Sequence, residues 1–292
     1  MKIAGHTMGT PEYTLDEAID LFSSMGLDGV EIIVQDGYLS GLPLDVSRNR
    51  LKEVLNHLLD KGLSISCLTP YNSRFNSSDG AVRNSEISGI KKVIDYAEFL
   101  DARYIRIYGG NLESVNSENR SSQEILLVKS LQELGDYAAE RGVNLVIENH
   151  FNTLTESAAD SIRISEMIGK SNVGILYDQA NLDFTYNEDF HHALDIQYRK
   201  IMYAHVKDLS FKQGNNTFTA SDVSHPKEEE RNVITRIIGE GSMDWRGIIT
   251  GLKQHGYDGW LSMEYERRWH PDDIPDASIG MKKGFEYLKS II

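Results

Sequence analysis

Short apolar runs alternate with longer segments of helical spacing along almost the whole chain. Apolar runs rich in β-branched residues are typical of buried strands, and apolar residues three and four positions apart are typical of amphipathic helices. The pattern predicts eight strands, near residues 2–8, 29–35, 63–69, 103–108, 144–149, 173–178, 201–207 and 259–265. Helical segments separate these strands, so strand and helix alternate.

Several helix boundaries are marked by the residues that normally start or stop a helix. Thr14 and Ser85 are candidate N-caps, because a side-chain oxygen can accept a backbone N–H of the first turn. Gly62, Gly142 and Gly256 stand where helices should end, since glycine readily adopts the left-handed conformation found there.

The order of elements decides between two α/β folds. Eight strand and helix units in 292 residues predict a closed (β/α)8 TIM barrel that forms a single domain over residues 1–292. A doubly wound open sheet is the alternative. It is weaker because no G-x-G-x-x-G follows the first strand and no phosphate-binding G-x-x-x-x-G-K-[ST] occurs.

Four apolar runs in the second half stop at a residue that can bind a metal. These residues are Glu148 in NLVIENH, Asp178 in VGILYDQANL, His205 in IMYAHVKD and Glu264 in GWLSMEYE. Burying an ionised carboxylate is costly unless a cation or hydrogen-bond donors compensate it. A shared cation is the simplest compensation, whereas separate ion pairs or strand-end caps are the alternative. In a barrel all four would lie at the C-terminal ends of the strands, where active sites are built.

Alternation along the strands predicts which way these side chains point, since every second residue faces the same side. The polar residues share one parity: Glu148 with His150, His205 with Lys207, and Glu264 with Glu266. The intervening residues are apolar and suit the layer under the helices: Leu145, Ile147, Leu261, Met263 and Tyr265. One imidazole with carboxylates suits Mn²⁺, Mg²⁺, Co²⁺ or Zn²⁺, and we expect Mn²⁺ because carboxylates favour the harder ions.

Composition narrows the partners of the protein. Thirty basic and 44 acidic residues give a formal charge of −14, which disfavours nucleic acid. No apolar run approaches the roughly 18 residues that span a bilayer, and the N-terminal segment MKIAGHTMGT does not resemble a signal peptide. We therefore expect a cytoplasmic protein. Cys67 is the single cysteine, which excludes an intrachain disulfide and a thiolate-rich zinc site and leaves a small core residue as its expected role.

In this order, the motifs resemble those of the xylose isomerase-like barrels, specifically the sugar phosphate isomerase/epimerase group. The match covers nearly the whole chain and rests on ENH at 148–150, Asp178, HVKD at 205–208, GEGSMDW at 239–245 and SMEYE at 262–266. The resemblance implies that Glu148, Asp178, His205 and Glu264 are the metal ligands. It also implies that Glu148 and Glu264 exchange protons with the substrate.

The implied activity is that of a metal-dependent sugar, sugar phosphate or polyol ketone isomerase or epimerase, which acts by proton abstraction next to a carbonyl through a metal-stabilised enediolate. A lyase of the same family is the first alternative, such as an inosose or dehydroshikimate dehydratase or an enzyme that cleaves 3-keto-glycosides or C-glycosides. A non-catalytic sugar-binding barrel is the second. The expected partner is a small carbohydrate, with a homo-oligomer or a partner subunit left open.

Five further residues are candidates for the site. His150 can be an additional acid or base, or a structural histidine. Lys207 can reach substrate oxygens or pair with a carboxylate. Glu240, Arg267 and His6 are candidate substrate contacts: a hydroxyl for Glu240, an anionic group for Arg267 and the pocket wall for His6.

Two departures from family patterns limit the choice of subgroup. Ketose 3-epimerases of this fold carry a His three residues after the strand-six Asp, where this chain has Asn181, and an Arg after the strand-seven His, where it has Phe211 and Lys212. The DNA-repair endonucleases of the same fold carry extra histidines on strands two and three, which are absent from EIIVQ and LTPYN. Both of these subgroups are therefore disfavoured.

Overall fold

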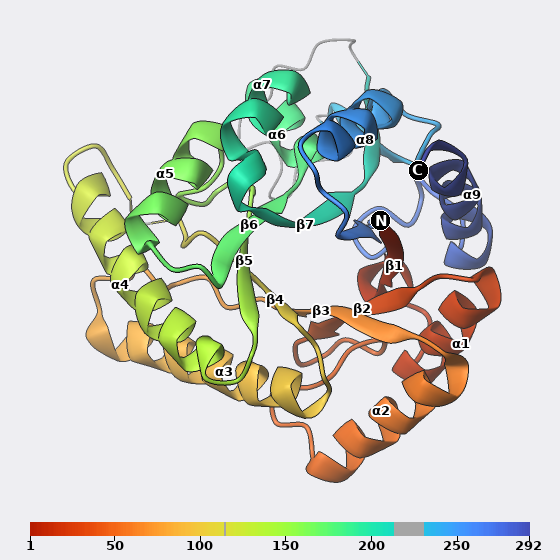
Figure 1. Cartoon of the computed structure of the whole chain (residues 1–292), viewed down its shortest axis with the longest axis horizontal. Helices are drawn as coiled ribbons and strands as arrows, with labels where there is room; N and C mark the ends of the chain where they lie inside the picture. Colours follow the sequence, from red (N-terminus) through yellow and green to blue (C-terminus); the bar gives the residue numbers. More distant parts are fainter. Residues whose placement is uncertain (114, 213–230) are drawn as a thin grey trace.

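In the computed structural model, eight parallel strands close into a barrel surrounded by helices (Figure 1). The structure describes residues 1–113, 115–212 and 231–292. The first strand closes the ring on the last, with Lys2 paired to Trp260 and Ala4 to Ser262, which excludes the open doubly wound sheet. The barrel strands are β1 (Lys2–His6), β2 (Gly29–Val34), β3 (Ser64–Pro70), β4 (Tyr104–Ile107), β5 (Asn144–Glu148), β6 (Val173–Tyr177), β7 (Ile201–Val206) and β10 (Trp260–Met263).

Helices follow the barrel strands in chain order, as the alternating pattern predicts. They are α1 (Leu15–Met25), α2 (Arg48–Lys61), α3 (Gly80–Phe99), α4 (Arg120–Ala139), α5 (Ala158–Ile168), α6 (Gln179–Tyr186), α7 (Phe190–Gln197), α8 (Trp245–Gln254) and α9 (Ala277–Ile291), with short 3₁₀ turns at Thr7–Gly9 and Tyr198–Lys200. In the described part of the chain, none of these helices is long and apolar enough to cross a membrane.

Most of the predicted helix boundaries are confirmed. The Thr14 side chain accepts the N–H of Glu17 at 3.3 Å, and the Glu17 carboxylate accepts the N–H of Thr14 at 2.8 Å. The glycines predicted as stops all have positive φ: 70° at Gly62, 68° at Gly142 and 81° at Gly256. The prediction for Ser85 is wrong. It lies inside α3, because Asp79 caps that helix earlier in the chain.

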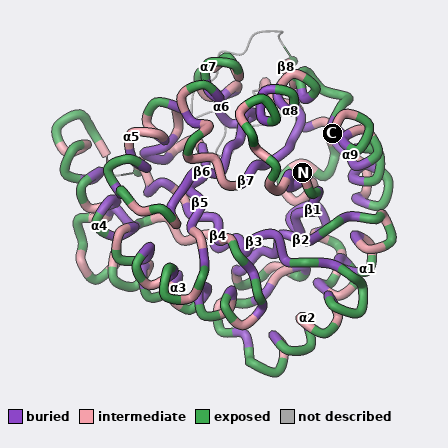
Figure 2. Tube along the Cα trace, in the orientation of Figure 1, coloured by how far each residue is buried: buried purple, intermediate pink, exposed green. Residues whose placement is uncertain are grey.

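The barrel separates two packed layers, which Figure 2 shows as buried strands inside helices with exposed outer faces. A small cluster fills the inside of the barrel and consists of Cys67, Val146, Leu176 and Tyr203. Strand residues of the opposite parity belong to the large cluster between strands and helices, among them Leu145 and Ile147 around Val146, and Leu261 and Met263 around the buried Ser262. The predicted parity is therefore confirmed, and so is a core position for Cys67.

A short hairpin after β7 was not predicted. Its strands are β8 (Asp208–Phe211) and β9 (Val233–Arg236), which pair antiparallel. The Asp208 carboxylate accepts four backbone N–H groups, from Leu209 (2.9 Å), Gly239 (2.8 Å), Gly241 (3.2 Å) and Met243 (3.2 Å). We call this set the Asp208 clasp. It joins the HVKD and GEGSMDW motifs, since it ties the start of β8 to the segment before α8.

Candidate metal centre

The four strand-end residues meet at the C-terminal ends of the barrel strands, here called the barrel mouth. Glu148 ends β5, Asp178 directly follows β6, His205 lies in β7 and Glu264 directly follows β10. One ligand atom from each lies within 4.8 Å of the others, and all four side chains are buried. We call these four residues the ligand cluster. Three carboxylates and one imidazole are thus placed where barrel active sites lie.

Asn181 ties two members of the ligand cluster together. The Asp178 carboxylate caps α6 by accepting the backbone N–H of Asn181 at 3.0 Å. The Asn181 side-chain amide donates to Asp178 Oδ2 at 3.0 Å and to the Asn149 carbonyl at 2.8 Å, and it lies 3.4 Å from Glu148 Oε1. The residue that replaces the histidine of ketose 3-epimerases is therefore used to orient carboxylates.

Two buried cations partly neutralise the cluster. Lys207 Nζ lies 2.7 Å from Glu264 Oε2 and 3.0 Å from Asp178 Oδ2, and its side chain is only 4% exposed. Arg106 Nε lies 3.3 Å from Glu148 Oε2, and its guanidinium stacks over the Tyr108 ring at 3.8 Å. Of the two readings open for Lys207, the structure places it in carboxylate pairs.

The charges and the unpaired atoms of this region fit a divalent cation. The buried carboxylates are Glu31, Glu148, Asp178 and Glu264, and the buried cations are Arg106 and Lys207. Among the described residues of this region, four negative and two positive buried charges leave two negative charges without a counterion, which is costly in a buried site. His205 Nδ1 is also buried without a hydrogen-bond partner, although it lies 3.3 Å from Glu148, 3.5 Å from Glu264 and 3.9 Å from Asp178. A nitrogen lone pair surrounded by carboxylate oxygens suits a metal ion.

The protonation equilibria respond to the same excess of negative charge. Burial raises the pKa of Asp178 to about 7, although Lys207 opposes this shift. Burial would lower the pKa of His205, but the carboxylates of Glu31 and Glu264 raise it well above its ordinary value. In the absence of a metal ion, protons on Asp178 and His205 would therefore offset part of the negative charge.

Two of the further candidate residues lie close to the cluster. Burial lowers the pKa of His150, and the nearby Glu148 carboxylate opposes this shift. His150 Nδ1 lies 2.7 Å from the Phe151 carbonyl and can donate to it, which leaves Nε2 as the acceptor of a neutral ring. His6 is fully buried, with its ring 5.7 Å from that of His205. His6 is therefore a buried neighbour of His205, and its role in the pocket wall stays a prediction.

The other two candidates are engaged elsewhere. Glu240 is exposed and pairs with Lys283 at 3.5 Å, so its position gives no support for a substrate contact. Arg267 donates to Glu12 at 2.9 Å and to the Ile274 carbonyl at 2.7 Å. The guanidinium of its neighbour Arg268 instead lies 3.9 Å above the Tyr38 ring.

Sequence reasoning missed two charged residues of this region, Glu31 and Arg106. Both side chains point into the barrel, because their neighbours along the strand belong to the outer apolar layer. Glu31 lies between Val30 and Ile32, and Arg106 lies between Ile105 and Ile107. The parity applied to β5, β7 and β10 could have found them. A lone charge inside an apolar strand was the available signal.

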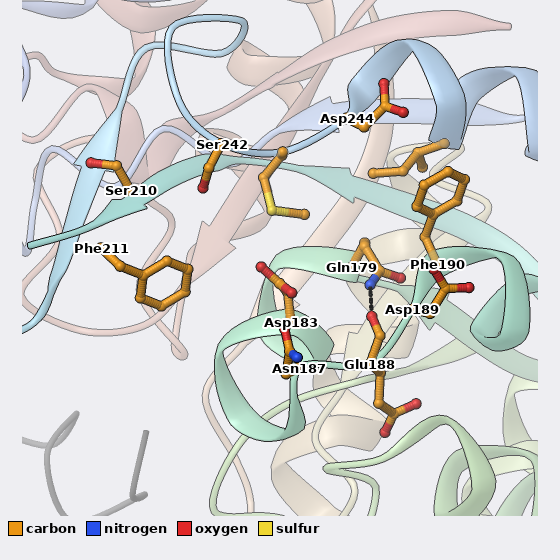
Figure 3. Close-up of a pocket in the computed structure, with 12 residues that line it drawn as sticks. Gln179, Asp183, Asn187, Glu188, Asp189, Phe190, Ser210, Phe211, Ser242 and Asp244 are labelled. Atoms are coloured by element: carbon orange, nitrogen blue, oxygen red, sulfur yellow. Dashed lines mark hydrogen bonds between the residues drawn. The ribbon is translucent and has the colours of Figure 1, made fainter. Parts of the chain in front are cut away.

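A separate hollow of about 540 Å³ lies between α6, α7, the hairpin and the start of α8 (Figure 3). No member of the ligand cluster lines it. Two of its carboxylates already cap helices, because Asp189 accepts the N–H of His192 at 3.1 Å and Asp244 that of Gly247 at 2.9 Å. The ligand cluster, with four buried ligand atoms within 4.8 Å of one another, therefore fits an ion better than this hollow does.

Named proteins match about half of this chain in sequence. In sequence, the chain is 31% identical over 142 residues to the inosose dehydratase of Geobacillus thermodenitrificans, covering 49% of this chain and 47% of that protein. It is 29% identical over 142 residues to the rhizopine catabolism protein MocC of Rhizobium meliloti, covering 48% and 42%. The chain thus spans about half the length of these relatives.

Solved structures match over the whole chain at low sequence identity. A D-psicose 3-epimerase crystallised in the presence of D-fructose superposes with a TM-score of 0.77 at 16% identity, covering 100% of this chain and 99% of that one. The IOLI protein with a bound zinc atom gives 0.77 at 20% identity, with coverage of 100% and 99%. The family model described as xylose isomerase-like TIM barrel matches residues 19–291. The chain therefore belongs to the family of xylose isomerase-like TIM barrels.

Proposed function

We propose that the protein is a divalent-metal-dependent isomerase or epimerase that removes a proton next to the carbonyl of a sugar or polyol ketone. One observation carries this proposal: two carboxylates that are far apart in the sequence approach the same ring nitrogen. Glu148 lies 3.3 Å and Glu264 lies 3.5 Å from His205 Nδ1. Family membership supports it at the level of the enzyme class.

The donor set defines the roles proposed for the residues. Glu148, Asp178, His205 and Glu264 would hold the ion, with Mn²⁺ the expected metal. When bound, such an ion polarises a carbonyl and an adjacent hydroxyl and so acidifies the neighbouring C–H. Glu148 and Glu264 can take the proton from one side and return it on the other or to the adjacent carbon.

The surrounding residues would assist the transfer. Arg106 and Lys207 each hold one oxygen of a proton-transferring carboxylate, which fixes the direction of the other oxygen. His150 presents Nε2 as an additional proton acceptor. Asn181 holds Asp178 in place through two hydrogen bonds.

The test is solvent deuterium incorporation into a panel of ketoses and polyol ketones, before and after chelation of the metal. We expect incorporation that needs the metal and is lost in Glu148→Gln and Glu264→Gln. Glu124→Gln is the matched control, because Glu124 is buried but pairs with Arg163 on the outer helices. Incorporation that is unchanged in both site variants would overturn the proposal, as would sugar binding without any turnover of metal-loaded protein.

A dehydratase is the second candidate, favoured by the names of the inosose dehydratases that match in sequence. The same proton abstraction leads to elimination when a leaving group lies beta to the carbon that loses the proton. Asn181 and Phe211, which depart from the ketose 3-epimerase pattern, agree with this candidate. Product analysis with inosose, dehydroshikimate and 3-keto-glycosides separates the two, because only elimination yields an unsaturated product or a released aglycone.

A further inference from the structure

The barrel interior holds a second group of metal-ligand residue types, which shares His205 with the ligand cluster. It consists of His6, Glu31 and His205, all fully buried. His205 Nε2 lies 3.1 and 3.2 Å from the two carboxylate oxygens of Glu31, whereas Nδ1 faces the ligand cluster. One imidazole therefore connects the two groups through its two nitrogens.

The hydrogen atoms of this second group can be assigned from its contacts. The backbone N–H of Met8 donates to His6 Nδ1 at 3.0 Å, so a neutral His6 carries its hydrogen on Nε2. That nitrogen lies 3.6 Å from Glu31 Oε1. A nitrogen that carries a hydrogen cannot bind a metal, so this group does not form a second ion site.

Glu31 is surrounded by groups that can donate to it. The Thr69 hydroxyl donates to Oε1 at 2.5 Å, and the Tyr203 hydroxyl lies 3.1 Å from Oε2. An ionised carboxylate only accepts hydrogen bonds, so the contact to His205 requires a hydrogen on Nε2. In a neutral ring this leaves the lone pair on Nδ1, directed at the ligand cluster.

We propose that Glu31 is a positioning residue that holds His205 in the tautomer and ring orientation in which Nδ1 can bind the divalent ion. The inference rests on the proposed metal function. A carboxylate that accepts the second N–H of a metal-binding histidine fixes the ring and increases its basicity, and loss of such a partner typically lowers metal affinity 10- to 100-fold.

The first test measures Mn²⁺ affinity of metal-stripped protein by isothermal titration. We expect Glu31→Gln to raise the dissociation constant roughly 10- to 100-fold, with recovery towards the wild-type value in Glu31→Asp. Glu124→Gln serves as the matched control and should bind as wild type does. Equal affinity of wild type and Glu31→Gln overturns the inference. If wild type binds none of Mn²⁺, Mg²⁺, Co²⁺ and Zn²⁺, the proposed function itself is overturned, so the two failures are distinguishable.

The second test does not depend on the folding of a variant. In zinc-loaded wild-type protein with ¹⁵N-labelled histidine, NMR reports which ring nitrogen of His205 carries hydrogen. We expect hydrogen on Nε2 and zinc on Nδ1. Zinc on Nε2, or hydrogen on Nδ1, overturns the inference.

Discussion

The ligand cluster and the group of His6, Glu31 and His205 contain similar residue types, yet only one is suited to an ion. In the ligand cluster, three carboxylates crowd around a nitrogen that has no hydrogen-bond partner. In the second group, the single carboxylate receives hydrogen bonds from the residues around it. The difference shows that an ion site needs uncompensated negative charge and a free lone pair, and that residue types alone do not identify it.

The largest expected effect separates the two groups directly. His205→Ala removes the nitrogen ligand, whereas His6→Ala removes only a neighbour of Glu31. At Mn²⁺ one hundred times above its dissociation constant, wild type should gain about 2.7 kcal/mol of unfolding free energy. We expect no gain for His205→Ala and most of the gain for His6→Ala in thermal unfolding with and without Mn²⁺. The opposite order would contradict the distinction between the groups.

The second prediction concerns the charge balance of the ligand cluster. Lys207→Met leaves Asp178 and Glu264 without their shared cation. Removal of one partner from a buried pair costs about 3–5 kcal/mol, and Mn²⁺ should restore part of this stability because it supplies positive charge. Urea unfolding with chelator and with Mn²⁺ measures both effects.

The surface pair of Lys170 and Asp136 supplies the control for this prediction, because Asp136 is 72% exposed. Lys170→Met should cost less than about 1 kcal/mol and should not respond to Mn²⁺. If both variants lose the same unfolding free energy and respond equally to Mn²⁺, the buried charge of the ligand cluster does not determine the stability.

A smaller effect is expected inside the second group. Thr69→Val removes a donor to Glu31 and should cost about 1–2 kcal/mol, with a modest loss of Mn²⁺ affinity because Glu31 is held less firmly. Thr10→Val is the matched control, since the buried Thr10 hydroxyl donates to the Thr7 carbonyl instead. Denaturant unfolding and titration calorimetry measure the pair. If Mn²⁺ affinity falls in Thr10→Val and not in Thr69→Val, the hydrogen bond from Thr69 to Glu31 does not influence metal binding.

The smallest effect is expected at Glu240. Its side chain is 55% exposed and its partner Lys283 is 57% exposed. Glu240→Gln should change the unfolding free energy by less than about 0.5 kcal/mol and leave Mn²⁺ affinity and turnover unchanged. A large rise in the Michaelis constant would restore the substrate contact predicted from the sequence.

The ligand cluster was predictable because its signal is local. Each of Glu148, His205 and Glu264 follows or interrupts an apolar strand on the inward parity, and a barrel gathers such ends at one place. The second group was not predicted because its key contact joins Glu31 and His205 across 174 positions. Local alternation shows which way a side chain points, but not which partner it meets across a barrel.

Short-range competition explains the other differences. Ser85 has the chemistry of a cap, but Asp79 reaches the first turn before it. The hairpin was missed because β8 begins at Asp208, only two residues after β7 ends at Val206, so the two strands are not separated by a turn signal. Glu240 belongs to a motif whose glycines serve the Asp208 clasp, and its contact with substrate stays a prediction.

The Asp208 clasp has a consequence for how the hairpin is held. One carboxylate fixes both the residue that enters the hairpin and the residues that follow it, and Asp208 directly follows Lys207, which pairs with two carboxylates of the ligand cluster. The clasp is therefore an anchor: it holds the start of β8 and the segment after β9 together independently of the contacts between the two strands.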